Sequence, residues 1–150
     1  MRKIYLILFV VLIFLTGCVN KKPDNINDVV ITLERTACYG TCHAYKLTIS
    51  GEGTVEYEGK QFVNVIGKQT DKISIGKVNE LVNTFYNINY FSLKDNYYEP
   101  VTDLPTTTTS ITINGKTKTV VDYVGAPQSL KDLENKIDEI TNSKRWIKGE

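Results

Sequence analysis

The 150-residue chain is poor in the residues that most catalytic and metal sites need. It contains one histidine, three cysteines, one methionine and one tryptophan. It has no Gly-x-Ser-x-Gly elbow and no glycine-rich phosphate loop, so the sequence offers no serine-hydrolase or P-loop template. A single histidine also leaves only one possible base for a Ser–His or Cys–His pair. We therefore expect a protein that is not an enzyme and that uses no cofactor.

An excess of charge of one sign is also missing. The chain carries 18 basic and 17 acidic residues, and without Arg2 and Lys3 the basic count falls to 16. A near-neutral body lacks the basic surface that neutralises phosphates, so we expect no nucleic-acid partner. The hydrophobic share of 41% and the charged share of 23% are those of an ordinary globular protein, and the length fits one domain.

A hydrophobic run long enough to cross a membrane is absent too. The longest apolar run covers residues 4–15, whereas a bilayer core needs roughly 20 apolar residues. Because Arg2 and Lys3 precede this run, residues 1–17 are typical of a signal peptide.

The segment Leu15-Thr16-Gly17-Cys18 resembles the lipobox of bacterial lipoproteins at every position. The resemblance implies cleavage between Gly17 and Cys18 and a lipid on the Cys18 sulfur. Several acyl chains hold a protein on a bilayer far better than one chain does. The alternative interpretation is an uncleaved anchor with an incidental cysteine.

Residues 18–28 are polar and predict a tether between the lipidated cysteine and a single domain over residues 29–150. Fully stretched, the tether reaches about 35 Å, so the domain stays near the bilayer surface. We expect an extracytoplasmic protein of the cell envelope. Because Val19 replaces the aspartate of enterobacterial inner-membrane sorting, we expect the outer membrane, facing the periplasm, if the cell is Gram-negative.

The first part of the domain alternates apolar and polar residues with a period of two, which is typical of strands. We expect four strands over residues 29–35, 45–49, 55–58 and 62–66, the last extending towards Ile73. Turns are expected at Gly51-Glu52-Gly53 and at Gly59-Lys60. Strands joined by such short turns form an antiparallel meander.

The period then changes to between three and four over residues 75–88, which predicts a helix that Ser74 can cap. Residues 89–105 show no period. Residues 107–123 predict a hairpin around Asn114-Gly115, because this pair tolerates the positive φ of a type I′ turn. Pro127 is suited to the start of a second helix, which runs to about Ile140.

The element order ββββ-α-ββ-α predicts an α+β fold, in which an antiparallel sheet carries both helices on one face. Trp146 and Ile147 are expected to pack the C-terminal tail against the domain.

Lipidation of Cys18 would leave Cys38 and Cys42 as a pair. Outside the cytoplasm two nearby thiols tend to oxidise, and Gly40 allows so short a loop to close, so we expect a structural disulfide. The alternative is a metal, haem or thiol-redox protein that uses Cys38, Cys42 and His43, since two thiolates and an imidazole suit zinc or copper. The Cys-x-x-x-Cys-His spacing is one residue longer than that of ordinary c-type haem attachment.

Segments 34–42 and 44–49 resemble the opening of a family of exported bacterial proteins known as domain of unknown function 6438. Segments 53–59, 102–107 and 114–120 are similar to later parts of that family, and the likeness covers about residues 30–140. The resemblance implies no activity. The family pattern usually has proline where this chain has His43, which weakens the case for a metal or haem site.

Exposed polar and aromatic residues in the irregular stretch are candidates for a binding surface, because binding residues often lie in loops. Asp103 either binds a ligand or forms a turn before Pro105. Tyr97 and Tyr98, with Tyr90 and Phe91 nearby, either form a recognition surface or cover the edge of the core.

The acidic residues Glu34, Glu56, Glu58 and Asp122 could in principle supply the paired carboxylates of a glycosidase. Glu56 and Glu58 fall on the polar face of a strand, however, which is usually a solvated face. The functional expectation is therefore a membrane-anchored, non-catalytic binding module whose partner is an unknown envelope protein or component.

Overall fold

A computed structural model describes residues 25–149. The expected signal peptide, Cys18 and residues 18–24 of the expected tether lie outside this part of the chain. Between residues 25 and 149, no helix is both long enough and apolar enough to cross a membrane.

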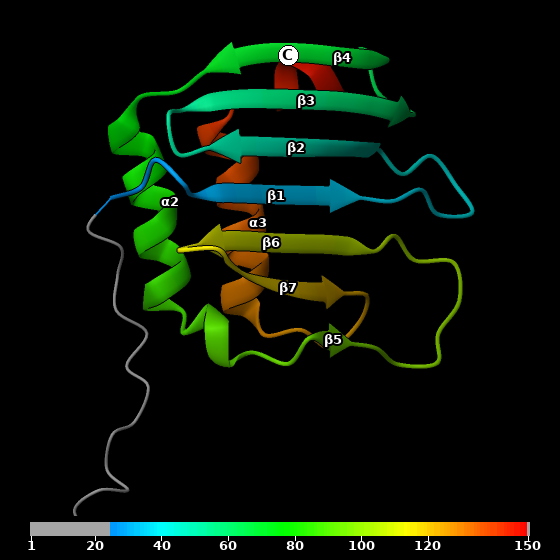
Figure 1. Ribbon diagram of the computed structural model, residues 1–150. Helices are drawn as coiled ribbons and strands as arrows, with labels where there is room; N and C mark the ends of the chain where they lie inside the picture. Colours follow the sequence, from blue (N-terminus) through cyan, green and yellow to red (C-terminus); the bar gives the residue numbers. More distant parts are fainter. Residues whose placement is uncertain (1–24, 150) are drawn as a thin grey trace, which may run out of the picture.

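Seven strands form one sheet in the order β4-β3-β2-β1-β6-β7-β5 (Figure 1). Their bounds are β1 (Val30–Arg35), β2 (Ala44–Ser50), β3 (Thr54–Gln61), β4 (Gly67–Lys72), β5 (Asn96–Tyr97), β6 (Thr107–Ile113) and β7 (Lys116–Asp122). Strand β1 lies at the centre, between β2 and β6, and pairs antiparallel with both. Only β5 pairs in parallel, with β7 at the sheet edge.

Two long helices, α2 (Ile75–Asn87) and α3 (Gln128–Ile140), cross the same face of the sheet (Figure 1). A short 3₁₀ turn, η1 (Tyr90–Ser92), follows α2, and a four-residue helix, α4 (Lys144–Ile147), follows α3. The Ser74 hydroxyl accepts a hydrogen bond from the Lys77 amide and caps α2, as its sequence predicts.

The core lies between the sheet and these helices. The inward residues of β1, Ile31 and Leu33, are fully buried, as the period of two predicts. The apolar stripe of α2, which includes Leu81 and Phe85, is also buried. Trp146 stacks on Tyr57 at 4.9 Å between ring centroids, so the C-terminal tail packs against the domain as expected.

The α+β class is confirmed, but the predicted wholly antiparallel sheet and the order ββββ-α-ββ-α are wrong in detail. The sheet is mixed, because β5 adds to its edge in parallel, and α4 adds a further helix. Strand β5 has only two residues, too few to show any alternation. Its pairing depends on hydrogen bonds to β7 and to the residue after it: Val121 N–H donates to the Asp95 carbonyl at 2.9 Å, and Tyr123 N–H donates to the Tyr97 carbonyl at 3.0 Å.

The predicted turn at Gly59-Lys60 and the predicted strand over residues 62–66 are also wrong. Strand β3 continues through Gly59, and the chain turns at Phe62, whose φ is 53°. A Cβ on Gly59 would lie 2.0 Å from the Val65 carbonyl oxygen and 2.6 Å from the Tyr57 hydroxyl. This glycine therefore permits a close approach of the following turn.

Antiparallel pairing gives the sheet two distinct ends. The chain enters at what we call the proximal end, formed by residues 25–29 and the turns 51–53 and 114–115. The opposite end, here called the distal end, is formed by loops 36–43, 62–66, 98–106 and 123–127 (Figure 1). Residue Arg35, where β1 ends, pairs with Tyr45 and with Thr107, so three strands meet the distal loops together.

Candidate functional site

A disulfide joins Cys38 to Cys42 in the distal loop between β1 and β2. Their Cα atoms are 5.5 Å apart, and the Gly40 amide donates a hydrogen bond to the Cys38 sulfur at 3.3 Å. The loop is therefore a closed, compact turn. At its tip the Tyr39 side chain is 91% exposed.

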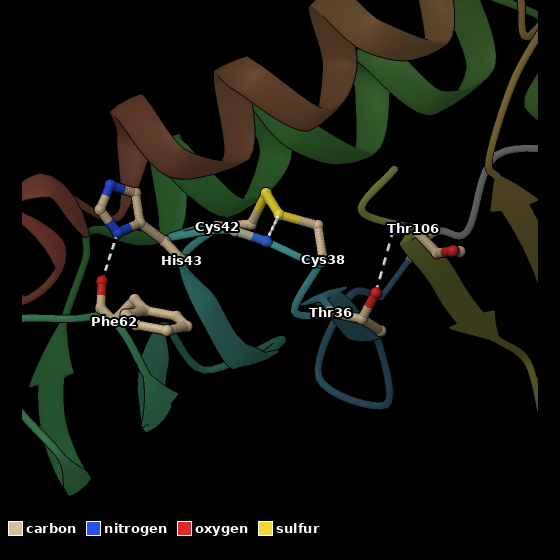
Figure 2. Close-up of a disulfide and its surroundings, with 7 residues drawn as sticks. Thr36, Cys38, Cys42, His43, Phe62 and Thr106 are labelled. Atoms are coloured by element: carbon tan, nitrogen blue, oxygen red, sulfur yellow. Dashed lines mark hydrogen bonds between the residues drawn. A yellow bond between two sulfur atoms is a disulfide. The ribbon is translucent and has the colours of Figure 1, made fainter. Parts of the chain in front are cut away.

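Neighbouring loops hold the disulfide loop on both sides (Figure 2). On one side, the Thr36 amide donates to the Thr106 carbonyl at 3.0 Å, and the Thr106 amide donates to the Thr36 hydroxyl at 3.0 Å. On the other side, His43 Nδ1 makes a hydrogen bond with the carbonyl oxygen of Phe62. The disulfide loop is thus braced by loops 62–66 and 98–106.

Exposed apolar side chains gather at the distal end. Of the eight large hydrophobic residues that are exposed between residues 25 and 149, six lie in the distal loops. They are Tyr39, Phe62, Ile66, Tyr98, Val101 and Leu104. The other two, Val30 and Ile75, start β1 and α2 respectively. Because these six residues share one end of the sheet, that end is the candidate for an interaction surface, whereas exposed apolar residues scattered singly over a surface are ordinary.

The 98–106 loop is itself ordered by an aromatic pair. Tyr98 stacks on Tyr123 with ring centroids 5.4 Å apart, and the Tyr123 hydroxyl donates to the Val101 carbonyl at 2.6 Å. Asp103 adopts a left-handed backbone conformation with φ of 67°, which suits the turn that leads to Pro105.

A cavity of about 650 Å³ lies beneath the disulfide loop, on the helix-bearing face of the sheet. Its walls come from the ends of β1, β2 and β6, from the disulfide loop and from the last turns of α3 and α4. The lining residues are Arg35, Cys42, His43, Tyr45, Pro105, Thr107, Asn135, Asp138, Glu139, Lys144, Ile147 and Lys148. This volume is in the range of sites for small ligands.

An ion pair with a shared hydrogen-bond network forms the floor of the cavity. Asp138 on α3 accepts from Arg35 Nε at 3.2 Å and Nη2 at 3.0 Å, both at Oδ2. Its other oxygen accepts from the Tyr45 hydroxyl at 2.6 Å and the Ser143 hydroxyl at 2.8 Å. Arg35 Nη1 donates to the Thr107 hydroxyl at 3.0 Å. All four lone-pair positions of the carboxylate are therefore used.

The electrostatics of this floor favour the charged form of Arg35 and the protonated form of Tyr45. Burial by itself lowers the pKa of Arg35, but the proximity of Tyr45 and Asp138 outweighs it and raises that pKa. Burial and the neighbouring Asp138 raise the pKa of Tyr45, so its hydroxyl stays protonated and donates.

Deeper under α3, a second carboxyl group is buried. Glu134 accepts from the Thr109 hydroxyl at 3.3 Å and is only 2% exposed. Burial raises the pKa of Glu134 to about 7, and the nearby Asp122 adds to this effect while Arg35 opposes it. Glu134 is therefore close to half protonated at neutral pH.

The rim of the cavity carries free charges. Lys144, Lys148 and Glu139 form no ion pair with any residue between 25 and 149. The rim thus has one positive charge in excess, since the Arg35–Asp138 pair on the floor cancels itself.

The structure separates the tyrosines that the sequence groups together. Tyr98 and Asp103 are exposed in the 98–106 loop, whereas Tyr97 is half-buried in β5. Tyr90 belongs to the core, where its hydroxyl donates to the Thr109 carbonyl at 2.6 Å. Phe91 is half-buried and packs against the core rather than on a recognition surface.

The sequence leaves open a metal, haem or redox role for Cys38, Cys42 and His43. In the structure the two cysteines are oxidised to a disulfide. Both sulfurs are bonded to each other, so neither is available as a thiolate ligand in this state. Within residues 25–149, no three acidic, histidine or cysteine side chains come together as metal ligands. Of the carboxylates, Asp122 is buried on the helix-bearing face, whereas Glu56 and Glu58 are exposed.

Sequence reasoning missed the cavity floor and rim, although a signal was present. Arg35 continues the inward alternation of Ile31 and Leu33, so a charged residue occupies a core-facing position. Glu134 and Asp138 follow Leu130 at intervals of four, on the buried stripe of α3. Charged residues at core-facing positions of two elements are a reason to look for a buried polar network.

A family described as "Domain of unknown function (DUF6438)" matches residues 29–141. The chain belongs to this family. The match covers the whole sheet and both long helices, so the distal end of this DUF6438 domain is part of the family's domain. No curated protein matches the chain.

Proposed function

We propose that this chain is an extracytoplasmic lipoprotein, anchored through lipid on Cys18, whose DUF6438 domain is a non-catalytic binding module of the cell envelope. The observation that supports the binding role is that six of the eight exposed large hydrophobic residues between residues 25 and 149 lie in the distal loops. The lipobox-like segment that ends at Cys18 supports the anchor.

The point at which the tether joins the domain bears on which way the distal loops face relative to the membrane. Residues 25–29 enter the domain at the proximal end, and β1 then runs about 20 Å before it reaches the distal loops. A domain held from its proximal end presents its distal end away from the bilayer. The partner that we expect is therefore a protein of the envelope rather than the anchoring lipid.

The distal loops are suited to binding because they are already ordered. Hydrogen bonds join Thr36 to Thr106 and His43 to Phe62, and a ring stack joins Tyr98 to Tyr123. A preordered loop loses little conformational entropy on binding, so more of the contact energy becomes affinity. Aromatic residues such as Tyr39 are frequent anchors in interfaces.

Site-specific photocrosslinking in the native membrane tests the proposal. A photoreactive phenylalanine analogue replaces Tyr39 at the distal end or, as the matched control, Ile75, which is 47% exposed near the proximal end. We expect one reproducible crosslinked protein from position 39 and none from position 75. Equal labelling at both positions, or no adduct at position 39, would contradict the proposal.

The metal and haem alternatives require the Cys38 and Cys42 sulfurs to be free of each other, whereas in this structure they form a disulfide. The thiol-redox alternative requires this disulfide to be reduced and re-formed in use. Absorption spectroscopy and elemental analysis of protein from its native host test the metal and haem alternatives directly. A Soret band or a stoichiometric metal would establish the alternative in place of our proposal.

A further inference from the structure

We propose that the cavity beside the disulfide loop binds a carboxylate group, such as that of a peptide C-terminus, which Arg35 receives at the cavity floor. This inference rests on the proposed binding function, because Cys42, His43 and Pro105 of the distal loops form part of the cavity wall. It adds the chemical class of the ligand, which the exposed apolar residues do not define.

Arg35 has donors left over for such a ligand. A guanidinium carries five N–H groups. One N–H of Arg35, on Nε, is shared between Tyr45 and Asp138, one on Nη1 bonds to Thr107, and one on Nη2 bonds to Asp138. Each terminal nitrogen therefore keeps a second N–H while Arg35 lines the cavity. Two neighbouring N–H donors match the two oxygens of a carboxylate.

Asp138 and Thr107 hold these donors in place before a ligand arrives. The Arg35 side chain is only 23% exposed and is fixed by bonds to three side chains. A donor that is already oriented costs less entropy on binding than a free surface arginine does.

The net charge of the residues that line the cavity favours a ligand with a single negative charge. Among the residues that line the cavity, Arg35 and Asp138 cancel, and the rim adds Lys144 and Lys148 against Glu139, which leaves an excess of one positive charge. The buried Glu134 also acts on Arg35 but does not line the cavity. A carboxylate carries one negative charge and balances this excess, whereas a phosphate monoester carries about −1.5 to −2. Glu139 would repel the additional charge of a phosphate.

The remaining wall is suited to the carbon atoms next to a carboxylate. Pro105 and Ile147 line the cavity together with the Cys42 side of the disulfide. A mostly apolar wall with a few placed polar groups is the usual composition of a small-molecule site. A short peptide end, with one methyl side chain per residue, fits this combination.

The test uses the full-length lipidated protein in detergent micelles and three probes. They are N-acetyl-dialanine with a free carboxylate, the same dipeptide as its C-terminal amide, and inorganic phosphate. Isotope-edited NMR follows the Arg35 Nε–H resonance during each titration. We expect the acid to bind with a dissociation constant on the order of 1 mM, typical of so small a ligand. The amide and phosphate should bind about ten-fold more weakly.

Rim variants test the assignment without touching the floor. Lys144→Gln combined with Lys148→Gln should weaken binding of the acid by about three-fold to ten-fold, because both changes remove positive charge. Glu139→Gln should strengthen it by a few-fold, because a repulsive charge is removed. The matched control is Lys116→Gln, an exposed lysine in the proximal hairpin, which should leave affinity unchanged.

Several outcomes would overturn the inference. Equal binding of acid and amide would show that the carboxylate is not recognised, and tighter binding of phosphate would assign a different anion. Weakening by Glu139→Gln would contradict the charge argument. If position 39 captures a partner while the acid fails to bind, the proposed function survives and the carboxylate site is wrong. If the acid binds while position 39 captures nothing, the carboxylate site stands without the proposed protein interface.

Discussion

Arg35, where β1 ends, donates two hydrogen bonds to one oxygen of Asp138 on α3, although 103 residues separate them in the chain. The side chains of the two residues are 23% and 14% exposed, so the pair is largely shielded from water. This contact joins the distal edge of the sheet to the helix that covers it. It also forms the floor of the cavity to which we assign the ligand.

Removing the carboxylate from this pair should destabilise the domain. Asp138→Ala leaves the Arg35 guanidinium and the Tyr45 hydroxyl without their acceptor, and breaking a buried pair in this way costs about 3 kcal/mol. Urea unfolding of the variant and the parent measures the difference. The matched control is Asp132→Ala on the same helix, where an exposed carboxylate meets only Gln128, and its effect should stay within about 0.5 kcal/mol.

Replacing both partners should cost less than replacing one, if the loss comes from an unpaired buried charge. Arg35→Met combined with Asp138→Leu removes both charges at similar volume, and such replacements are often close to neutral. A double variant less stable than Asp138→Ala would show that the Arg35–Asp138 network adds to the stability of the domain. The attraction within the pair would then exceed the free energy that burying its charges costs.

Glu134 should make stability fall as the pH rises. Its folded pKa of about 7 lies above its ordinary value of 4.5, so the folded state binds the proton more tightly than the unfolded state. The loss of folding free energy that results is absent below pH 4.5, grows between pH 4.5 and 7, and levels off above pH 7 at about 3 kcal/mol. Glu134→Gln should therefore be more stable than the parent at pH 8 and similar to it at pH 4.

Thermal unfolding at closely spaced pH values checks this prediction. The difference between parent and variant isolates Glu134, because every other titrating group is common to both proteins. A difference that is constant from pH 4 to pH 8 would show that Glu134 does not titrate abnormally.

The disulfide should shape its loop more than it stabilises the domain. A chain-entropy estimate for so small a loop gives about 2 kcal/mol, which Cys38→Ser with Cys42→Ser should lose while the domain stays folded. His43→Pro should cost at most about 1 kcal/mol, since one hydrogen bond to Phe62 is lost. Circular dichroism with urea titration measures both. Loss of the fold in His43→Pro would reveal a structural role that the single contact does not explain.

The mass of the intact protein from its native host tests the proposed anchor and the disulfide together. We expect a chain that begins at Cys18, increased by the mass of its acyl groups and reduced by two hydrogens for the bond between Cys38 and Cys42. Treatment with a reductant should restore those two hydrogens only. An unmodified chain that begins at Met1 in the cytosolic fraction would contradict the lipoprotein proposal.

Much of the fold could be predicted because its signals are local. The alternation in β1, the Ser74 cap and the hairpin at Asn114-Gly115 depend on residues close together in the chain, and the structure contains all three. The turn predicted at Gly59 was wrong because glycine is typical both of turns and of positions where another backbone segment comes close. Only the position of the Val65 carbonyl, which the tertiary structure determines, decides between them.

The candidate site was harder to predict than the fold. Sequence reasoning found the disulfide loop and the exposed Tyr98, but it could not pair Arg35 with Asp138 or gather the distal loops at one end. These relationships arise from the register of β1 with β2 and β6, and from the way α3 crosses the sheet.

The amino-acid sequence by itself determined the two long helices, most of the strands and the apolar faces of both, because periodicity and turn chemistry act over a few residues. The tertiary structure alone decided the order of the strands, the addition of β5 to the edge and the assembly of the cavity. Those features depend on contacts between residues tens of positions apart, and a pattern within a few neighbouring residues does not predict which of these contacts form.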